Sequence, residues 1–434
     1  MPRCNNWCAT ALPRRRPRTA SAKAGSSAPS GPCIKSAAKP RKHDETMQRI
    51  YLDNAATTWP KPEPVYEAVE RYQRDIGASA GRGAYREAGE AHRVVDEARL
   101  ACAQLLDVPE PRQIIFGCNA TDLLNLAIVG MLRRGDRVVS TVVEHNSVLR
   151  PLAGWREPLE LDVVHVGCDA HGYVDLDEFR RECQVKPPRI VAINHGSNVS
   201  GAIQPVREMA AIARDAGAFV VLDAAQSLGH VPLTLPELDV DLLAASAHKG
   251  LLGPAGTGLL AIRPGVEQHL RPWKLGGTGG DSDARIMPEA LPARYEAGSH
   301  NVPALAGVTA AVRYLQEHGV AAMAEHEAAL TVRLMGGLAD IPGVTIYGAP
   351  SEHRRLGVVS FAVAGYDPQE FATMLDASAG VQARAGLHCA PLLHRALGSH
   401  SMGGLVRLSI GWANTLEQID AAIAAVEQLS AATI

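Results

Sequence analysis

The sequence has 434 residues, of which 46% are hydrophobic and 21% are charged, and its formal net charge is -3. A chain of this length can bury a large core, which we expect to be divided between two lobes. No stretch approaches the apolar length that is needed to span a bilayer, which excludes a membrane-spanning protein, and we expect a soluble protein.

The first 46 residues differ in composition from the rest. They carry ten lysines or arginines and only two acids, Asp44 and Glu45, so this segment is about +8 and the remainder about -11. The segment is rich in Pro, Ser and Ala and lacks apolar periodicity, so we expect it to be disordered. It is a targeting peptide, a basic arm for nucleic acid, or an extension upstream of a true start at Met47. We favour the third interpretation, because an enzyme-like opening begins at Ile50, and we do not expect nucleic acid as a partner.

The cysteines are scattered and form no CxxC pair. In a long chain without a secretory signal this pattern favours reduced thiols in the cytoplasm and argues against a structural metal site. The eight positions are Cys4, Cys8, Cys33, Cys102, Cys118, Cys168, Cys183 and Cys389.

Short β-rich runs alternate with helical patterns after residue 50. Such alternation predicts an α/β fold with a mostly parallel sheet covered on both faces, and the strands read as the continuous apolar runs of buried parallel strands. The predicted strands are 114–116, 137–141, 161–166, 189–194, 219–223 and 242–245, and the clearest helices are 121–132 and 206–216.

The pattern changes near residue 300. Helices are predicted at 302–317, 324–338 and 368–377, with strands at 344–347, 358–363 and 406–410. The last helix begins at Thr415, where Thr415 and Gln418 form a capping box. We therefore predict a large domain over 47–300 and a smaller α+β domain over 301–434. The N-terminal arm of the large domain is expected to join the small domain.

Lys249 is the most informative single residue. It lies in the run Ser246–Gly250, after an apolar strand and before a glycine-rich segment. A lysine at a strand end among small residues can be desolvated, which frees its amine for imine chemistry. Asp223 ends another apolar strand, at the edge where open α/β sheets bind ligands, and an acid there can hold a pyridine nitrogen.

Three further segments supply polar groups to the same edge. Ala120 and Thr121 begin a helix whose N–H groups suit a phosphate, and Ser246 and His248 can add donors. His145 follows a strand, where its imidazole can stack on a pyridine ring. By itself the phosphate signal is weak, because threonine is also a common helix cap, and for His145 alone a hydrogen-bonded loop histidine is the favoured interpretation.

Cys389 lies in the loop 384–391, beside His388 and five residues after Arg384. Neighbouring cationic groups favour the thiolate, which is the nucleophilic form of cysteine. Arg384 and Arg407 are candidate clamps for a substrate carboxylate, since a guanidinium binds one bidentately.

In this order and spacing, the motifs resemble the class V aminotransferase family, and within it the cysteine desulfurases and selenocysteine lyases. Ile50–Thr58, Asn198–Gly201 and Gly276–Gly280 also match that family, and the resemblance covers about residues 48–430. It implies the fold type I of pyridoxal-phosphate (PLP) transferases, with a seven-stranded-type sheet and a smaller C-terminal domain.

The resemblance implies a role for each matching residue. Lys249 would bind PLP as a Schiff base and then move a proton, and Cys389 would attack the sulfur of L-cysteine. The cofactor would be held by Ala120, Thr121, His145, Asp223, Gln226 (on the ring hydroxyl), Ser246, His248 and, from the other subunit of a homodimer, Thr278. The substrate carboxylate would be bound by Asn198 and Arg407, with Arg384 nearby.

The sulfur would pass to an acceptor protein, as in iron–sulfur cluster assembly, or to a reductant. Cys389 favours a desulfurase over an aminotransferase or C–S lyase, whose reactions need no nucleophilic cysteine, and selenocysteine remains an alternative substrate. The loop resembles that of group II desulfurases, except that Leu387 stands where these commonly have a first histidine.

Overall fold

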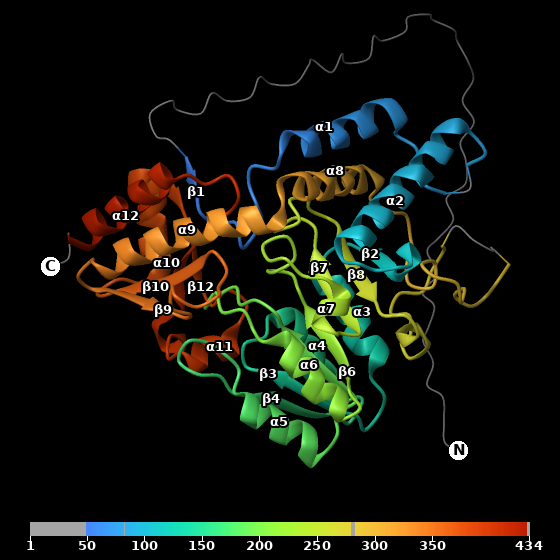
Figure 1. Cartoon of the computed structure of the whole chain (residues 1–434), viewed down its shortest axis with the longest axis horizontal. Coiled ribbons are helices and arrows are strands. Elements are labelled where there is room, and N and C mark those ends of the chain that lie inside the picture. The colour runs from blue at the N-terminus through green and yellow to red at the C-terminus, as the bar shows by residue number, and fades with distance from the viewer. Residues whose placement is uncertain (1–48, 82, 279–282, 432–434) are drawn as a thin grey trace, which may run out of the picture. The chain divides into compact units, whose positions relative to one another are not determined.

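The computed structural model describes residues 49–431 except residue 82 and residues 279–282 (Figure 1). The predictions for residues 1–46 and for a start at Met47 lie outside these residues. The contacts within the chain divide it into two units, Met1–Glu45 and Thr46–Ile434, and the described residues belong to the second. Within the described residues, no helix has both the length and the apolarity to cross a membrane.

A seven-stranded sheet forms the larger part of the fold, as the sequence predicts. Its order is β2-β8-β7-β6-β5-β3-β4, and all its neighbours are parallel except β8, which runs antiparallel to β2 and to β7. The strands are β2 (Ile114–Gly117), β3 (Arg137–Thr141), β4 (Asp162–Val166), β5 (Ile190–Asn194), β6 (Phe219–Asp223), β7 (Leu242–Ser246) and β8 (Gly258–Ile262).

Helices bury both faces of this sheet, which explains why its strands read as unbroken apolar runs. Successive residues of β6 enter different cores: Val221 packs with α3 and α4, whereas Val220 and Leu222 pack with the helices of the other face. The first face is covered by α3 (Ala120–Met131) and α4 (Asn146–Arg156), and the second by α2 (Arg86–Leu105), α5 (Leu176–Val185), α6 (Val206–Asp215) and α8 (Val302–His318).

A second, four-stranded sheet is antiparallel throughout, in the order β12-β13-β10-β9. Its strands are β9 (Val344–Tyr347), β10 (Val358–Val363), β12 (Arg384–Gly386) and β13 (Leu405–Ser409). Its core is closed by α9 (Val320–Ala339), α10 (Pro368–Ala379) and α12 (Leu416–Ala431). The chain therefore has the predicted α/β fold with a smaller C-terminal α+β part.

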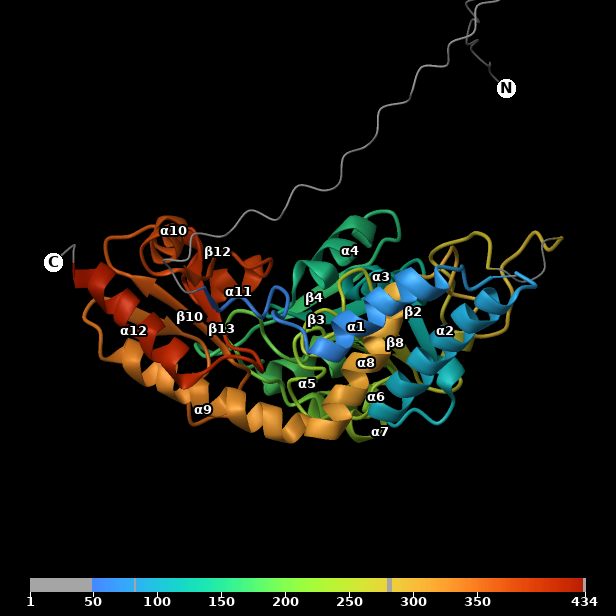
Figure 2. The same cartoon turned by 90° about the horizontal axis from the view of Figure 1, so that it is seen from above.

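The beginning of the described chain packs with its end. β1 (Ile50–Tyr51) pairs in parallel with β11 (Val381–Gln382), and Ile50 and Leu52 enter the core of the small sheet. By contrast, α8 packs beside α1 (Glu63–Arg71) and α2, as both views show (Figures 1 and 2). The apolar face of α8, which begins at Val302, belongs to the core of the large sheet. The domain boundary at residue 300 stays a prediction.

Local signals in the sequence explain several element ends. At the start of α12, Thr415 Oγ1 accepts from the Gln418 N–H at 3.4 Å, and Gln418 Oε1 accepts from the Thr415 N–H at 3.3 Å, which is the predicted capping box. β8 was not predicted, because its apolar run continues directly from a glycine-rich segment. The predicted helix 324–338 begins four residues earlier, at Val320.

Candidate functional site

A cavity of about 270 Å³ opens at the carboxyl ends of the parallel strands. Asn194, Asp223 and Ser246 are the last residues of β5, β6 and β7, so the strand ends place them at one edge of the sheet. Residues predicted for the site that line this cavity are Ala120, Thr121, His145, Asn198, Asp223, Gln226, Ser246, His248 and Lys249.

Lys249 follows β7 in a turn that the N-terminal arm holds by its backbone. Thr58 Oγ1 donates to the Lys249 carbonyl at 2.9 Å. The preceding carbonyl, of His248, accepts from the Thr58 N–H, Thr57 Oγ1 and Lys61 Nζ at 3.0, 3.1 and 2.7 Å. Burial lowers the pKa of Lys249 to about 8, although Asp223 acts in the opposite direction. The amine is therefore much closer to its neutral, nucleophilic form at pH 7 than an exposed lysine is.

Asp223 and Gln226 line the same cavity as the α3 terminus. Burial raises the pKa of Asp223, whereas the Ala225 N–H, which donates to Oδ1 at 2.9 Å, and Lys249 act against that rise. A cationic ring nitrogen placed against this carboxylate would provide the charge partner that a buried acid requires. Gln226 Nε2 donates to the carbonyl of Ala55, which fixes the orientation of the amide.

The N-terminus of α3 forms one wall of the cavity. Asn119 caps the helix, and its Oδ1 accepts from the Asp122 N–H at 2.9 Å. Ser246 Oγ accepts from the Ala120 N–H at 2.9 Å, and Thr121 Oγ1 lies 2.9 Å from Ser147 Oγ. Backbone N–H groups and hydroxyls at a helix N-terminus suit a phosphate group.

His145 caps α4 with its own imidazole. Its Nδ1 accepts from the Ser147 N–H at 3.0 Å, so the ring proton resides on Nε2. Burial, followed by the charges of Lys249 and Arg384, lowers the pKa of His145 to about 4. The ring is thus neutral at pH 7 and offers a flat, uncharged face to the cavity.

Two buried polar atoms of the cavity wall lack hydrogen-bond partners among the described residues. They are Asn194 Oδ1 and His248 Nδ1. Unsatisfied buried groups are costly in a native protein, so these atoms are expected to bind a ligand or water. Together with the amine, the buried acid and the helix terminus, they fit an aromatic aldehyde that carries a phosphate, as PLP does.

Cys389 lies at the edge of a second, open groove of about 500 Å³. Thr121, His145 and Ser147 line both this groove and the cavity of Lys249, so the two spaces share a wall. Arg384 Nη2 lies 3.7 Å from Cys389 Sγ, so a guanidinium N–H group donates to the sulfur.

The turn that carries Cys389 is anchored on both sides. His388 and Cys389 have φ angles of 47° and 59°, a left-handed conformation that residues with side chains seldom adopt. The Asn146 N–H donates to the carbonyl of Cys389 at 2.7 Å, and Asn198 Nδ2 donates to that of His388 at 2.6 Å. The thiol is consequently held at the groove beside the cavity rather than on a free loop.

Arg407 is fully buried and already paired. Its Nη2 donates to Asp53 Oδ1 at 2.6 Å, and its Nη1 donates to the carbonyl of Asn198 at 3.2 Å. Its Nε has no partner among the described residues. The carboxylate clamp that we predicted for Arg407 stays a prediction, and its guanidinium is oriented by an acid of the N-terminal arm. Thr278 is not among the residues that line the cavity, and its role toward a second subunit also stays a prediction.

Several residues of the site were missed by the sequence analysis. Asn194 carried a usable signal, since it ends a predicted strand of the same sheet. Ser147, which bridges Thr121 and His145, carried none. Neither did Asp53 or Lys61, whose partners lie 354 and 187 positions further along the sequence.

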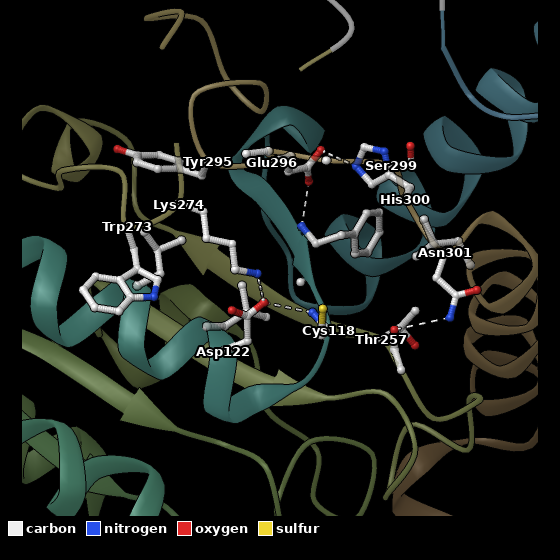
Figure 3. Close-up of a pocket in the computed structure, with 18 residues that line it drawn as sticks. Cys118, Asp122, Thr257, Trp273, Lys274, Tyr295, Glu296, Ser299, His300 and Asn301 are labelled. Atoms are coloured by element: carbon white, nitrogen blue, oxygen red, sulfur yellow. Dashed lines mark hydrogen bonds and ion pairs between the residues drawn. The ribbon is translucent and has the colours of Figure 1, made fainter. Parts of the chain in front are cut away.

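A further cavity, of about 130 Å³, borders α3 at Asp122 and is lined by none of the predicted site residues (Figure 3). Its charged groups are largely paired with one another. Lys274 Nζ lies 2.7 Å from Asp122 Oδ2, and Glu296 binds both His300 and the buried Arg99. Charges that neutralise each other leave little to bind a substrate, so we regard the cavity of Lys249 as the reactive one.

Comparison with known proteins supports this choice. Residues 50–422 match the model of the family described as aminotransferase class-V. A probable cysteine desulfurase of Methanothermobacter thermautotrophicus is 36% identical over 373 residues, which cover 85% of this chain and 92% of that protein.

Solved structures agree with these relatives. A cysteine desulfurase from Thermococcus onnurineus in its apo form has a TM-score of 0.82 and 34% identity, covering 88% of this chain and 95% of that one. For the Escherichia coli cysteine desulfurase CsdA, the TM-score is 0.79 and the identity 28%, with 89% and 95% covered. The chain therefore belongs to the class V aminotransferase family.

Proposed function

We propose that this chain is a PLP-dependent cysteine desulfurase, which converts L-cysteine to L-alanine and carries the sulfur as a persulfide on Cys389. The observation that carries the proposal is the position of this thiol. Its turn is tied to Asn146 and Asn198, its sulfur faces Arg384, and its groove shares a wall with the cavity of Lys249. An aminotransferase or a C–S lyase has no use for such a thiol.

The cofactor would be held by the residues that line the cavity. Lys249 would bind its aldehyde carbon, Asp223 its ring nitrogen and Gln226 its ring hydroxyl, while His145 would stack on the ring. The phosphate would be bound by the α3 terminus at Ala120 and Thr121, and by Ser246 and His248. Bound in this way, PLP supplies an electron sink for a negative charge at the substrate α-carbon.

The chain's own residues would then move a proton and the sulfur. Lys249, once its amine is free, takes the proton from the substrate α-carbon, because its lowered pKa leaves it partly neutral. Cys389 thiolate attacks the substrate sulfur, so that an S–S bond forms and the Cβ–S bond breaks. The electron pair of that bond stays with Cβ, which takes a proton to become the methyl group of alanine. The substrate carboxylate would be bound near Asn198, Arg384 and Arg407.

The persulfide would pass its outer sulfur to an acceptor protein or to a reductant. We further propose that the enzyme acts in the cytoplasm as a homodimer, in which Thr278 of each chain reaches the cofactor phosphate of the other. The described cysteines, all of them free thiols, agree with a reducing compartment.

The test is an assay of alanine and persulfide formation from L-cysteine by the PLP-loaded protein. Lys249→Ala should lose both the absorbance of the bound cofactor and the activity. Cys389→Ala should keep the absorbance but lose about 90% or more of alanine formation, because among the described residues no other cysteine lines the cavity of Lys249 or the groove beside it. Cys118→Ala, which removes an exposed thiol elsewhere, is the matched control and should behave as wild type. Normal alanine formation by Cys389→Ala would refute the nucleophile and favour a lyase.

A further inference from the structure

A hydrogen-bonded chain of three buried side chains leads away from the turn of Cys389. His388 Nδ1 lies 3.3 Å from His394 Nε2, and His394 Nδ1 lies 2.8 Å from Ser399 Oγ. The two imidazole rings are stacked, with centroids 5.4 Å apart. His394 belongs to the short helix α11 (Pro391–Ala396), and Ser399 follows that helix.

The three hydrogen-bonded side chains are shielded from water. His388 is 2% exposed, and His394 and Ser399 are completely buried. Two imidazoles and a hydroxyl in such a place cost free energy unless they find hydrogen-bond partners. Both nitrogens of His394, the Ser399 hydroxyl and His388 Nδ1 bond to one another, whereas His388 Nε2 has no partner among the described residues. Nothing in the proposed reaction has yet used His394 or Ser399, so their burial beside the nucleophile calls for another role.

The protonation states follow from this burial. Burial lowers the pKa of His388 well below its ordinary value and that of His394 to about 4, so both rings are neutral at pH 7. A neutral imidazole has one donor and one acceptor nitrogen. Of the two facing nitrogens, His388 Nδ1 and His394 Nε2, one must therefore carry a proton and the other must not. The hydroxyl of Ser399 can donate or accept, so it can pair with His394 Nδ1 in either case.

His388, the first of the three hydrogen-bonded side chains, directly precedes the nucleophile Cys389. His388 and Cys389 share a left-handed turn, in which the Ala390 N–H donates to the carbonyl of Leu387 at 2.9 Å. Such a conformation persists only where neighbouring contacts determine it. The backbone carbonyls are held by Asn146 and Asn198, and His394 holds the side chain of His388.

We propose that His394 and Ser399 are positioning residues for Cys389: they fix His388, and through it the turn that keeps the thiol against Arg384. The inference rests on the proposed function in taking Cys389 as the nucleophile. It adds that the reactivity of this thiol depends on two side chains that do not touch the substrate.

The experiment measures the pH at which Cys389 of the PLP-loaded enzyme is half-maximally alkylated by iodoacetamide, with the site identified by mass spectrometry. A looser turn alone changes the alkylation rate at every pH but not this midpoint, whereas loss of the Arg384 contact raises the midpoint. The variants are His394→Leu, His394→Gln and Ser399→Ala. His400→Ala is the matched control, because it removes a partly exposed histidine of the same segment that lies outside the chain.

For His394→Leu we expect the midpoint to rise by about 0.5 to 1 pH unit and kcat for alanine formation to fall about 3- to 10-fold, the effect of one buried hydrogen bond. KM for L-cysteine should stay unchanged. His394→Gln, whose amide can still bond to His388, should recover much of the loss. Ser399→Ala should shift the midpoint in the same direction by less, and His400→Ala should not shift it.

Wild-type midpoint and kcat in His394→Leu would overturn the proposal, and so would a rate change without a shift of the midpoint. If His394→Leu does not fold, His394→Gln and Ser399→Ala decide: the smaller shift in Ser399→Ala supports the proposal, and wild-type behaviour of both variants overturns it. If the wild-type enzyme releases no alanine from L-cysteine, the proposed function fails by itself, and the alkylation midpoints still judge this inference.

Discussion

Lys249 depends on residues that precede it by almost two hundred positions. One carbonyl, that of His248, accepts from Thr58, Thr57 and Lys61, and the next accepts again from Thr58. These bonds fix the backbone on both sides of the lysine, so its side chain can reach only a narrow range of positions. Burial lowers the pKa of Lys61 to about 7, and among the described residues no carboxylate lies within 4.0 Å of its amine.

The pH dependence of cofactor capture follows from the surroundings of Lys249. Only a neutral amine attacks an aldehyde, and burial lowers the pKa of Lys249 from 10.5 to about 8. We therefore expect the rate at which cofactor-free protein binds added PLP to rise with pH and to level off above about pH 8. The absorbance of the bound cofactor, followed by stopped flow, measures this rate.

Lys274→Ala, which removes a lysine of the neighbouring cavity, serves as the control and should leave the pH profile unchanged. A rate that continued to rise as far as pH 10 would contradict the lowered pKa. Lys249→Ala should show no covalent capture at any pH.

The sequence predicts the site residues that end strands, because the carboxyl ends of parallel strands meet at one edge of the sheet. Asp223 and Ser246 are of this kind, and Lys249 follows closely. The sequence does not predict Asp53, Lys61 or His394, whose contacts are made across the tertiary fold. No local pattern records that Asp53 will face Arg407, which lies 354 positions further along the sequence.

At the scale of elements, periodicity located six of the seven strands of the large sheet and its helices α3, α6 and α8, because both faces of the sheet are covered and the apolar runs are long. It did not locate the helices α2, α4 and α5, and it also failed where a strand is short or begins in glycine. β8 begins at Gly258, and β12 has only three residues, Arg384–Gly386. In both, the neighbouring strand rather than the local sequence stabilises the extended backbone.

The capping box of α12 makes a prediction at this scale. Thr415→Ala removes the side-chain acceptor of the Gln418 N–H, which should cost about 1 kcal/mol of helix-end stability. The amides of the first turn, from Leu416 to Gln418, should then exchange with deuterium about fivefold faster, while those near Val426 keep their wild-type rate.

Thr373→Ala is the control, because the hydroxyl of Thr373 donates only to the carbonyl of Gln369 within α10. Faster exchange throughout α12 would mean that the helix unfolds as a whole and that the box does not act locally.

At the scale of the whole described unit, an ion pair joins the lysine turn to the long helix α9. His230 Nδ1 lies 2.8 Å from Glu327 Oε2, and His230 packs against Gly250, next to Lys249. Gly229 has a φ of 90° and lies so close to the carbonyl of Gly250 that a side chain would clash. The far half of α9 packs in the core of the small sheet, so this pair links both cores behind the site.

The pair should make stability depend on pH. Burial by itself lowers the pKa of His230, but the carboxylate of Glu327 outweighs it, so the pKa is raised above 6.5. The pair's contribution is therefore fully present below about pH 6.5 and is lost as pH rises through the folded-state value. Glu327→Gln should lower the free energy of unfolding by about 1–3 kcal/mol at pH 6 and by clearly less at pH 9.

Urea unfolding of the wild type and the variant at both pH values measures this difference. Glu325→Gln, which changes an exposed acid on the same helix, should alter stability by less than about 0.5 kcal/mol at either pH. An equal loss from Glu327→Gln at pH 6 and pH 9 would refute the charge on His230.

The pairing of the N-terminal arm with the last strands has a consequence for how the protein is made. Asp53 meets Arg407, and Asn54 meets Ser409 and Asn414, so the first described residues find their partners only near the end of the sequence. During synthesis, the arm can therefore make its contacts both with the backbone around Lys249 and with the guanidinium of Arg407 only after almost the entire chain has left the ribosome. A nascent chain that stalls before residue 407 would contain every residue of the cofactor cavity and still have an unfinished site.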